Sequence, residues 1–103
     1  MEENTVEANR HFFIALSNPV DGCEDEYNEW YDTKHVPECL QVAGFKTGQR
    51  FKLSASLNGE PNQRYLALYE LEGDDPQAIL DALHASRNER MSSPAFDRDS
   101  LSM

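Results

Sequence analysis

The sequence predicts one α+β domain with an antiparallel sheet. Three apolar or alternating segments, residues 11–16, 45–53 and 64–71, have the length and composition of strands. Two others, residues 21–35 and 75–86, have the start signals and apolar spacing of helices. A chain of 103 residues can build one hydrophobic core but not two. We therefore expect a flexible N-terminus at residues 1–9 and a single domain at residues 10–103.

Composition and charge exclude several classes of function. Hydrophobic residues make up 39% and charged residues 27% of the chain, which is typical of globular proteins. The net charge of −10 argues against nucleic acid and anionic membrane surfaces, because clustered Lys and Arg bind both. No apolar run approaches the roughly 20 residues of a membrane helix, and the polar start lacks the pattern of a signal peptide. We expect a cytoplasmic protein whose partners are small molecules or proteins, without nucleic-acid or membrane partners.

The first predicted strand and helix follow from local signals. Residues 11–16 are apolar on both alternating faces, which suits a strand covered on both sides. Asp21 and Glu24 have the spacing of a capping box, in which Asp21 accepts backbone N–H bonds and Glu24 reaches back. The helix should end near His35, because Pro37 disfavours helical geometry in the residue before it.

The second and third predicted strands should pair as a hairpin across a turn-rich connection at residues 54–62. In residues 45–53 the side chains alternate strictly, as in a half-exposed strand. One face of this strand should carry Phe45, Thr47, Gln49, Phe51 and Leu53, and the other Lys46, Arg50 and Lys52.

The second predicted helix begins with Asp75 as N-cap and Pro76 at the first helical position. The order strand, helix, strand, strand, helix is that of a ferredoxin-like split βαβ fold, which normally closes with a fourth strand. From Arg87 the chain is polar, and the four residues 100–103 make a poor strand. We expect the fourth strand to be very short, to be missing, or to come from a partner chain.

The segment NEWYDTKHVPE at residues 28–38, followed by a short turn and by Ala43-Gly44-Phe45 opening a strand, resembles a known family. It is similar to the aromatic-aspartate-x-x-histidine-x-proline signature that ends the first helix of EthD-like proteins in the dimeric α/β-barrel superfamily. The resemblance covers roughly residues 10–85. It implies a ferredoxin-like protomer whose sheet packs face to face with that of a second copy in a homodimer.

The same resemblance implies light chemistry on small molecules. Members of the superfamily include polyketide cyclases, cofactor-free monooxygenases, small dehydratases, muconolactone isomerases and haem-degrading enzymes, beside many proteins without an assigned activity. In the cyclase-like members a histidine and a tyrosine that face an apolar cleft move protons. His35 is the residue of this chain that matches the signature histidine.

Candidate catalytic residues lie on the first helix. Tyr27, Tyr31 and His35 are four residues apart and share a stripe, and Asp32 lies three residues before His35. A carboxylate there could fix the imidazole tautomer and raise its basicity. Trp30 and the tyrosines would supply apolar walls with polar tips. The alternative is structural, since histidines suit helix C-termini and aromatic residues at this spacing are more often core.

Two strands supply further candidates for a cavity. Tyr65 and Tyr69 share a face of the third strand and could line the cleft, although cross-strand packing is the alternative. Thr47 and Gln49 interrupt an apolar strand face, and buried polar groups need hydrogen-bond partners. The expected substrate-binding residues are Tyr27, Trp30, Gln49, Phe51 and Tyr65.

Metals and cofactors are not expected. Cys23, Cys39 and His35 could supply three zinc ligands, but structural zinc sites usually include a close CxxC pair, which is absent. His84 could be an axial haem ligand, yet its helix has the pattern of an ordinary amphipathic helix. No motif for nucleotide binding, phosphate binding or serine hydrolysis is present.

Together, the residues and the resemblance predict a small cofactor-independent enzyme that moves a proton on a hydrophobic or aromatic metabolite, in a cyclisation, dehydration or isomerisation. His35 would act as the acid or base, oriented by Asp32, with Tyr27 or Tyr31 as hydrogen-bond donor. Two alternatives stay open. One is a non-catalytic module that binds a small molecule or stabilises a partner enzyme, and the other is a cofactor-free or haem-degrading monooxygenase.

Overall fold

The computed structural model describes residues 9–57 and 59–103. The predicted flexible N-terminus therefore falls, apart from Asn9, outside the described residues. The elements in chain order are β1 (Arg10–Pro19), α1 (Glu24–Trp30), the π-helix η1 (Tyr31–His35), α2 (Val36–Cys39), β2 (Phe45–Lys52), β3 (Tyr65–Glu72), α3 (Pro76–Ala85), the 3-10 helix η2 (Arg87–Glu89) and β4 (Phe96–Ser102).

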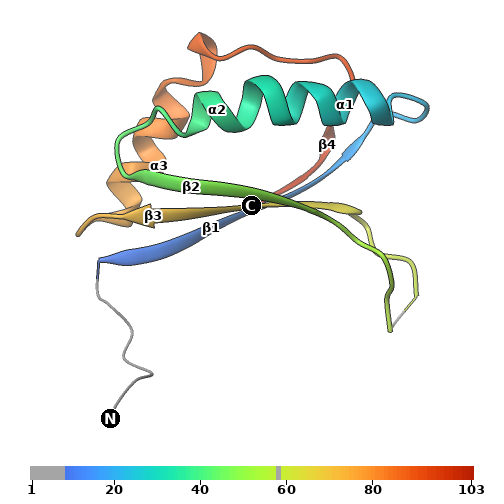
Figure 1. Cartoon of the computed structure of the whole chain (residues 1–103), viewed down its shortest axis with the longest axis horizontal. Coiled ribbons are helices and arrows are strands. Elements are labelled where there is room, and N and C mark those ends of the chain that lie inside the picture. Colours follow the sequence, from blue (N-terminus) through green and yellow to red (C-terminus); the bar gives the residue numbers. More distant parts are fainter. Residues whose placement is uncertain (1–8, 58) are drawn as a thin grey trace.

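These elements form an α+β fold, as predicted. The four strands make one antiparallel sheet in the order β2-β3-β1-β4. Figure 1 shows α1 and α2 as a nearly continuous helical run above the sheet, and α3 at the end of the sheet where β3 leaves it. The segment that follows α3 passes over this helical run before it turns down into β4 (Figure 1).

The fourth strand is present, so the expectation of a short or missing strand is wrong. β4 begins at Phe96, well before the last four residues, and pairs with β1 beside Asn18 and Pro19. Its sequence is difficult to read as a strand because Asp97, Arg98 and Asp99 follow one another. An edge strand tolerates such residues, since one of its sides faces solvent.

The first helix starts and ends later than predicted. It begins at Glu24 after Cys23, and no side chain caps it, so the capping box at Asp21 does not form. The chain also passes Pro37 without leaving helical geometry. In η1 the N–H of Val36 donates to the carbonyl of Tyr31, five residues earlier, and this wider turn immediately precedes the proline.

Strand β2 contains an irregularity that reverses its predicted faces. Its register with β3 shifts between Phe45 and Thr47, as at a β-bulge. Phe45 is buried, but beyond the shift Gly48 lies opposite Tyr69 and faces the helices, where a Cβ would come within 2.9 Å of Val36. Arg50 therefore also points under the helices, and its predicted place on the solvent face is wrong.

Helix α3 closes the core at one end of the sheet, with the cap predicted from the sequence. The Asp75 side chain accepts a hydrogen bond from the N–H of Ala78 at 3.1 Å, and Ile79 is buried. Gly44 adopts φ +98°, and a Cβ on it would lie 2.7 Å from Ile79 Cδ1. Across residues 9–57 and 59–103, no helix combines the length and hydrophobicity needed to cross a membrane.

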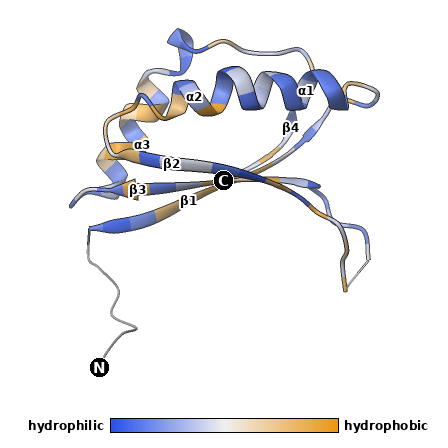
Figure 2. Cartoon of the chain, in the orientation of Figure 1, coloured by the Kyte–Doolittle hydropathy of each residue, from blue (hydrophilic) through white to orange (hydrophobic). Residues whose placement is uncertain are grey.

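Only one face of the sheet is covered by described elements (Figure 1). The covered face of β3 is buried from end to end, through Tyr65, Ala67, Tyr69 and Leu71. On the opposite face Phe12 is 71% exposed and Ile14 is 44% exposed. The prediction that β1 is covered on both sides is therefore wrong within one chain, because one of its faces is exposed. Figure 2 shows that its hydrophilic start gives way to an apolar middle part.

Candidate functional site

A cavity of about 440 Å³ lies between the helices and the covered face of the sheet. Its walls come from β1, β3, β4 and the helices α1, η1, α2 and α3, and they are mostly apolar, including Phe13, Trp30, Tyr31, Leu80, Leu83 and Phe96. The few polar side chains on it are those of His35, Cys39, Tyr69, His84 and Arg90. This combination of apolar walls and few polar groups is typical of small-molecule sites.

His35 lies on this cavity at the end of η1. Its ring stacks on Trp30 with centroids 4.8 Å apart and lies edge-on to Tyr31 at 4.9 Å. Nε2 is 3.7 Å from the sulfur of Cys39, whereas Nδ1 is buried and has no hydrogen-bond partner among the described residues.

Burial, and then the positive charges of Arg90 and Arg50, lower the pKa of His35 to about 4. The imidazole is therefore neutral at neutral pH, and it is a weaker base than an exposed histidine. This is opposite to the raised basicity that the sequence led us to expect.

Tyr69 supplies a second unpartnered polar atom to the cavity. Its side chain is 1% exposed and packs against Phe13 and Phe45, with ring centroids 5.8 and 5.4 Å away. Among the described residues its hydroxyl has no hydrogen-bond partner of normal geometry. Burial raises the pKa of Tyr69, and a weak interaction with the Cys39 thiol raises it further. Buried polar groups without partners are rare in folded proteins, and here two of the residues that line one cavity carry such a group.

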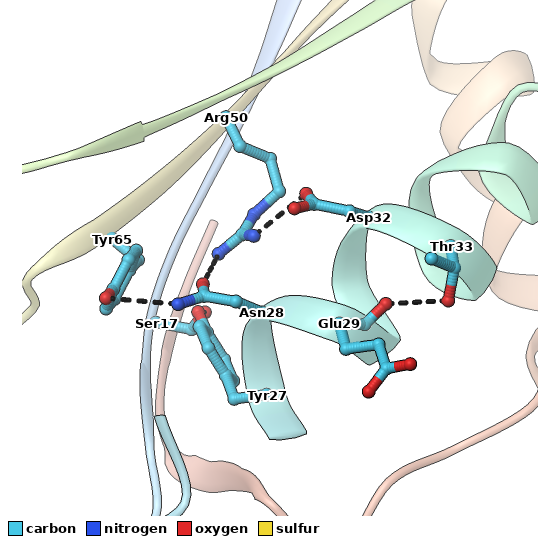
Figure 3. A network of polar contacts seen from close by, with 8 residues as sticks. All are labelled: Ser17, Tyr27, Asn28, Glu29, Asp32, Thr33, Arg50 and Tyr65. Atoms are coloured by element: carbon cyan, nitrogen blue, oxygen red, sulfur yellow. Dashed lines mark hydrogen bonds and ion pairs between the residues drawn. The ribbon is translucent and has the colours of Figure 1, made fainter. Parts of the chain in front are cut away.

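Asp32 does not orient His35, which corrects the predicted pair. Its carboxylate accepts a hydrogen bond from Nη1 of Arg50 at 3.0 Å and is 60% exposed (Figure 3). A π turn takes more residues than an α turn, so positions three apart no longer stack above one another. Asp32 is thereby directed to the β2 edge of the sheet and away from the cavity.

Arg50 organises a cluster that sequence reasoning missed. Its guanidinium carbon lies 4.3 Å from the ring centroid of Tyr31, 5.3 Å from Tyr27 and 5.4 Å from Tyr65. Nη2 donates to the amide oxygen of Asn28 at 2.9 Å (Figure 3). A glycine inside a strand often marks a bulge, so Gly48 was the available signal that Arg50 could turn inward.

Two predicted site tyrosines belong to this cluster and to the core. Tyr27 is 0% exposed, and its hydroxyl lies 2.6 Å from the Ser17 hydroxyl, so it is a core residue (Figure 3). The Tyr65 hydroxyl donates to the Glu24 carboxylate. Tyr31 lies between the two sites, since one face of its ring meets Arg50 and its edge meets His35. Burial raises the pKa of Tyr31 to about 12.

Gln49 and Phe51 do not reach the cavity. Both are exposed beyond the bulge of β2. A second depression of about 460 Å³ at this edge of the sheet is lined by Asp32, Val36, Gly48, Arg50, Phe51, Lys52 and Tyr65. Its charged groups already pair, as in the 3.2 Å contact of Lys52 with Glu24. The cavity at His35 is therefore the stronger candidate.

The three residues considered as zinc ligands, Cys23, His35 and Cys39, do not come together in one site. Cys39 is buried beside His35, and Cys23 is partly buried. In the described part of the chain, no three His, Cys, Asp or Glu side chains lie close enough together to hold a metal ion.

Comparison with known proteins leaves the EthD-like resemblance a prediction that depends on residues 28–38 and the strand that follows. A scan against protein-family models found no match, and searches of curated proteins and of solved structures found none either.

Proposed function

We propose that this chain is a small cofactor-independent enzyme, of the EthD-like type, that moves a proton on a hydrophobic or aromatic metabolite. The observation that carries the proposal is that His35 and Tyr69, which both line one apolar cavity, each hold a buried polar atom without a hydrogen-bond partner among the described residues, namely Nδ1 and the hydroxyl. Neutral His35 can take a proton from a carbon beside a carbonyl. Tyr69 can donate a hydrogen bond to the carbonyl oxygen on which negative charge develops. Tyr69 thus takes the role first assigned to Tyr27 or Tyr31.

The proposal is tested with the metabolites of the host organism. Wild-type protein is incubated with small-molecule extract from its host, and the compounds consumed and formed are identified by mass spectrometry. We expect a conversion that His35→Gln and Tyr69→Phe abolish and that His11→Gln, a histidine change outside the cavity, retains. Conversion that persists undiminished in His35→Gln would overturn the proposed role of this residue.

A Tyr69→Phe variant should be more stable than the wild type. Removal of a buried hydroxyl without a partner should raise the free energy of unfolding by about 1–2 kcal/mol. Tyr27→Phe is the matched control with the opposite expected sign, because the Tyr27 hydroxyl bonds to Ser17 at 2.6 Å. Urea unfolding measures both changes. A loss of stability in Tyr69→Phe would mean that the hydroxyl is structural.

A non-catalytic binding module is the alternative that the same cavity supports. In that case His35→Gln changes the affinity for the bound compound, and no compound is converted by wild-type protein. A haem-degrading activity has less support, because His84 is exposed and one axial histidine alone does not specify haem. If the Soret band of added haemin is not shifted by the protein, this activity is excluded.

We also propose that the fold is ferredoxin-like and that two copies pair through the uncovered face of the sheet. The strand order β2-β3-β1-β4 is the support for the fold. The support for pairing is the apolar face that Phe12, Ile14 and Phe51 leave exposed. Two sheets can pack face to face at a spacing of about 10 Å, which would bury these side chains.

Ile14→Asp should convert the proposed dimer into a monomer. Ile14 lies in the middle of β1 opposite Leu68, so pairing of the sheets would bury the new carboxylate without a partner. Light scattering after gel filtration reports the molecular mass. Leu57→Asp, which adds the same charge at a fully exposed position, should stay dimeric. A monomeric wild-type protein would refute the pairing.

A further inference from the structure

A second cavity, of about 520 Å³, adjoins the cavity at His35. The two share five lining residues, namely Trp30, His35, Arg90, Phe96 and Leu101. Its remaining wall comes from Arg98 of β4 and from the segment between α3 and β4, which is hydrogen-bonded to the helices at Met91. The carbonyl of Met91 accepts a hydrogen bond from Nε1 of Trp30 at 3.1 Å, and its N–H donates to Glu38 at 3.0 Å. The side chains of Trp30 and His35 are therefore part of the walls of both cavities.

This second cavity, called the outer cavity below, is lined by positively charged side chains in a strongly acidic protein. Three of its lining residues are arginines, namely Arg87, Arg90 and Arg98. The chain has 19 acidic and nine basic residues, yet no Asp or Glu of the described ranges lines either cavity. A third of the basic residues thus line a cavity that has no Asp or Glu among its described lining residues.

These arginines are also not neutralised by ion pairs. Across residues 9–57 and 59–103, the side-chain ion pairs involve Arg10, Lys46, Arg50 and Lys52. Arg87 donates instead to the carbonyl of His84 at 3.0 Å, and Arg90 to the carbonyl of Leu83 at 2.8 Å. Within residues 9–57 and 59–103, the exposed guanidinium of Arg98 has no hydrogen-bond or ion-pair partner.

We infer that the two cavities together bind an aromatic carboxylic acid. Its ring would lie in the cavity at His35 and its carboxylate among Arg87, Arg90 and Arg98. The inference rests on the proposed function and names its substrate class. Arginine forms paired, charge-assisted hydrogen bonds with carboxylates, and these are stronger than hydrogen bonds between neutral groups. His35 and Trp30 lie on both cavities. A ligand whose carboxylate is bound by the arginines would therefore have the atoms between its carboxylate and its ring beside His35.

The test compares two probes with the same ring system, 2-naphthoate and 2-naphthylmethanol, by isothermal titration calorimetry. We expect wild-type protein to bind the carboxylate about tenfold more tightly than the alcohol, a difference that added salt reduces. Arg98→Gln should weaken binding of the carboxylate only, and Arg90→Gln/Arg98→Gln should remove its advantage. Arg64→Gln removes the same charge from an exposed residue outside both cavities and should change neither affinity.

The outcomes separate this inference from the function on which it rests. Equal affinities for the two probes, insensitive to the arginine changes, would overturn the carboxylate site and leave the cavity at His35 as a site for neutral ligands. Failure of both probes to bind would also overturn the carboxylate site, whereas the proposed function would still be decided by conversion of a host metabolite. If the double variant does not fold, Arg98→Gln alone decides, because Arg98 is exposed and supports no other described side chain.

Discussion

Tyr27→Ala is expected to lower the free energy of unfolding by about 3–5 kcal/mol, because it removes a large, fully buried aromatic side chain. The Tyr27 ring lies 5.4 Å from Tyr31, 5.2 Å from Tyr65 and 6.3 Å from Phe96, so its loss leaves a void between helix and sheet. It also leaves the buried Ser17 hydroxyl without its partner. Typical domains are stable by about 5–15 kcal/mol, so the variant should be only marginally folded.

Urea unfolding followed by the fluorescence of Trp30, the single tryptophan, measures this loss. Leu57→Ala truncates a side chain that is 101% exposed and should change stability by less than about 0.5 kcal/mol. A loss below about 1 kcal/mol in Tyr27→Ala would contradict the core role assigned to this tyrosine.

A second large effect is expected from pH. The pKa of His35 is lowered from 6.5 to about 4 in the folded protein, so protons bind this residue more readily in the unfolded chain. The stability that neutral His35 contributes is complete above pH 6.5 and falls as the pH drops from 6.5 toward 4. Through this residue, the free energy of unfolding should fall by about 3 kcal/mol in total.

The effect of His35 is isolated by comparison with His35→Gln. Unfolding free energies of the two proteins at pH 7, about 5.5 and about 4.5 should converge, or cross, as the pH falls. His84→Gln, a change at an exposed histidine, is the matched control. A constant difference between wild type and His35→Gln over this range would show that His35 is not held neutral by the fold.

The sequence predicted the elements whose pattern is regular. Residues 64–71 and the cap at Asp75 appear in β3 and α3 almost as expected. The fourth strand could not be read in the same way, because its apolar residues are far apart and charged residues lie between Phe96 and Leu101. Its strand geometry depends on pairing with β1, and no local signal reports that pairing.

The site was only partly predictable for a related reason. His35, Trp30 and Tyr31 share the cavity, in agreement with their spacing on one helix. Two irregularities displaced other candidates. The π turn at η1 directs Asp32 away from His35, and the bulge in β2 exchanges the faces of the residues that follow it. Each irregularity shifts the phase of a periodic pattern by about one residue, which is enough to move a side chain to another surface.

The two features that displaced these candidates also support the cavity. Arg50 points inward because of the bulge, and it packs on the face of Tyr31 while its Nη1 donates to Asp32. The edge of Tyr31 in turn contacts the His35 ring at 4.9 Å. The Arg50 cluster therefore holds η1 against the sheet and fixes one wall of the cavity.

The most direct test of the central claim, that the cavity keeps His35 neutral with a nitrogen available to a ligand, is an NMR titration of the His35 ring nitrogens. The account predicts an apparent pKa of about 4 and a shift of the Nδ1 resonance when 2-naphthoate is added at neutral pH. Protonation of His35 with an ordinary pKa of 6.5, or an Nδ1 resonance that saturating 2-naphthoate leaves unchanged, would contradict it.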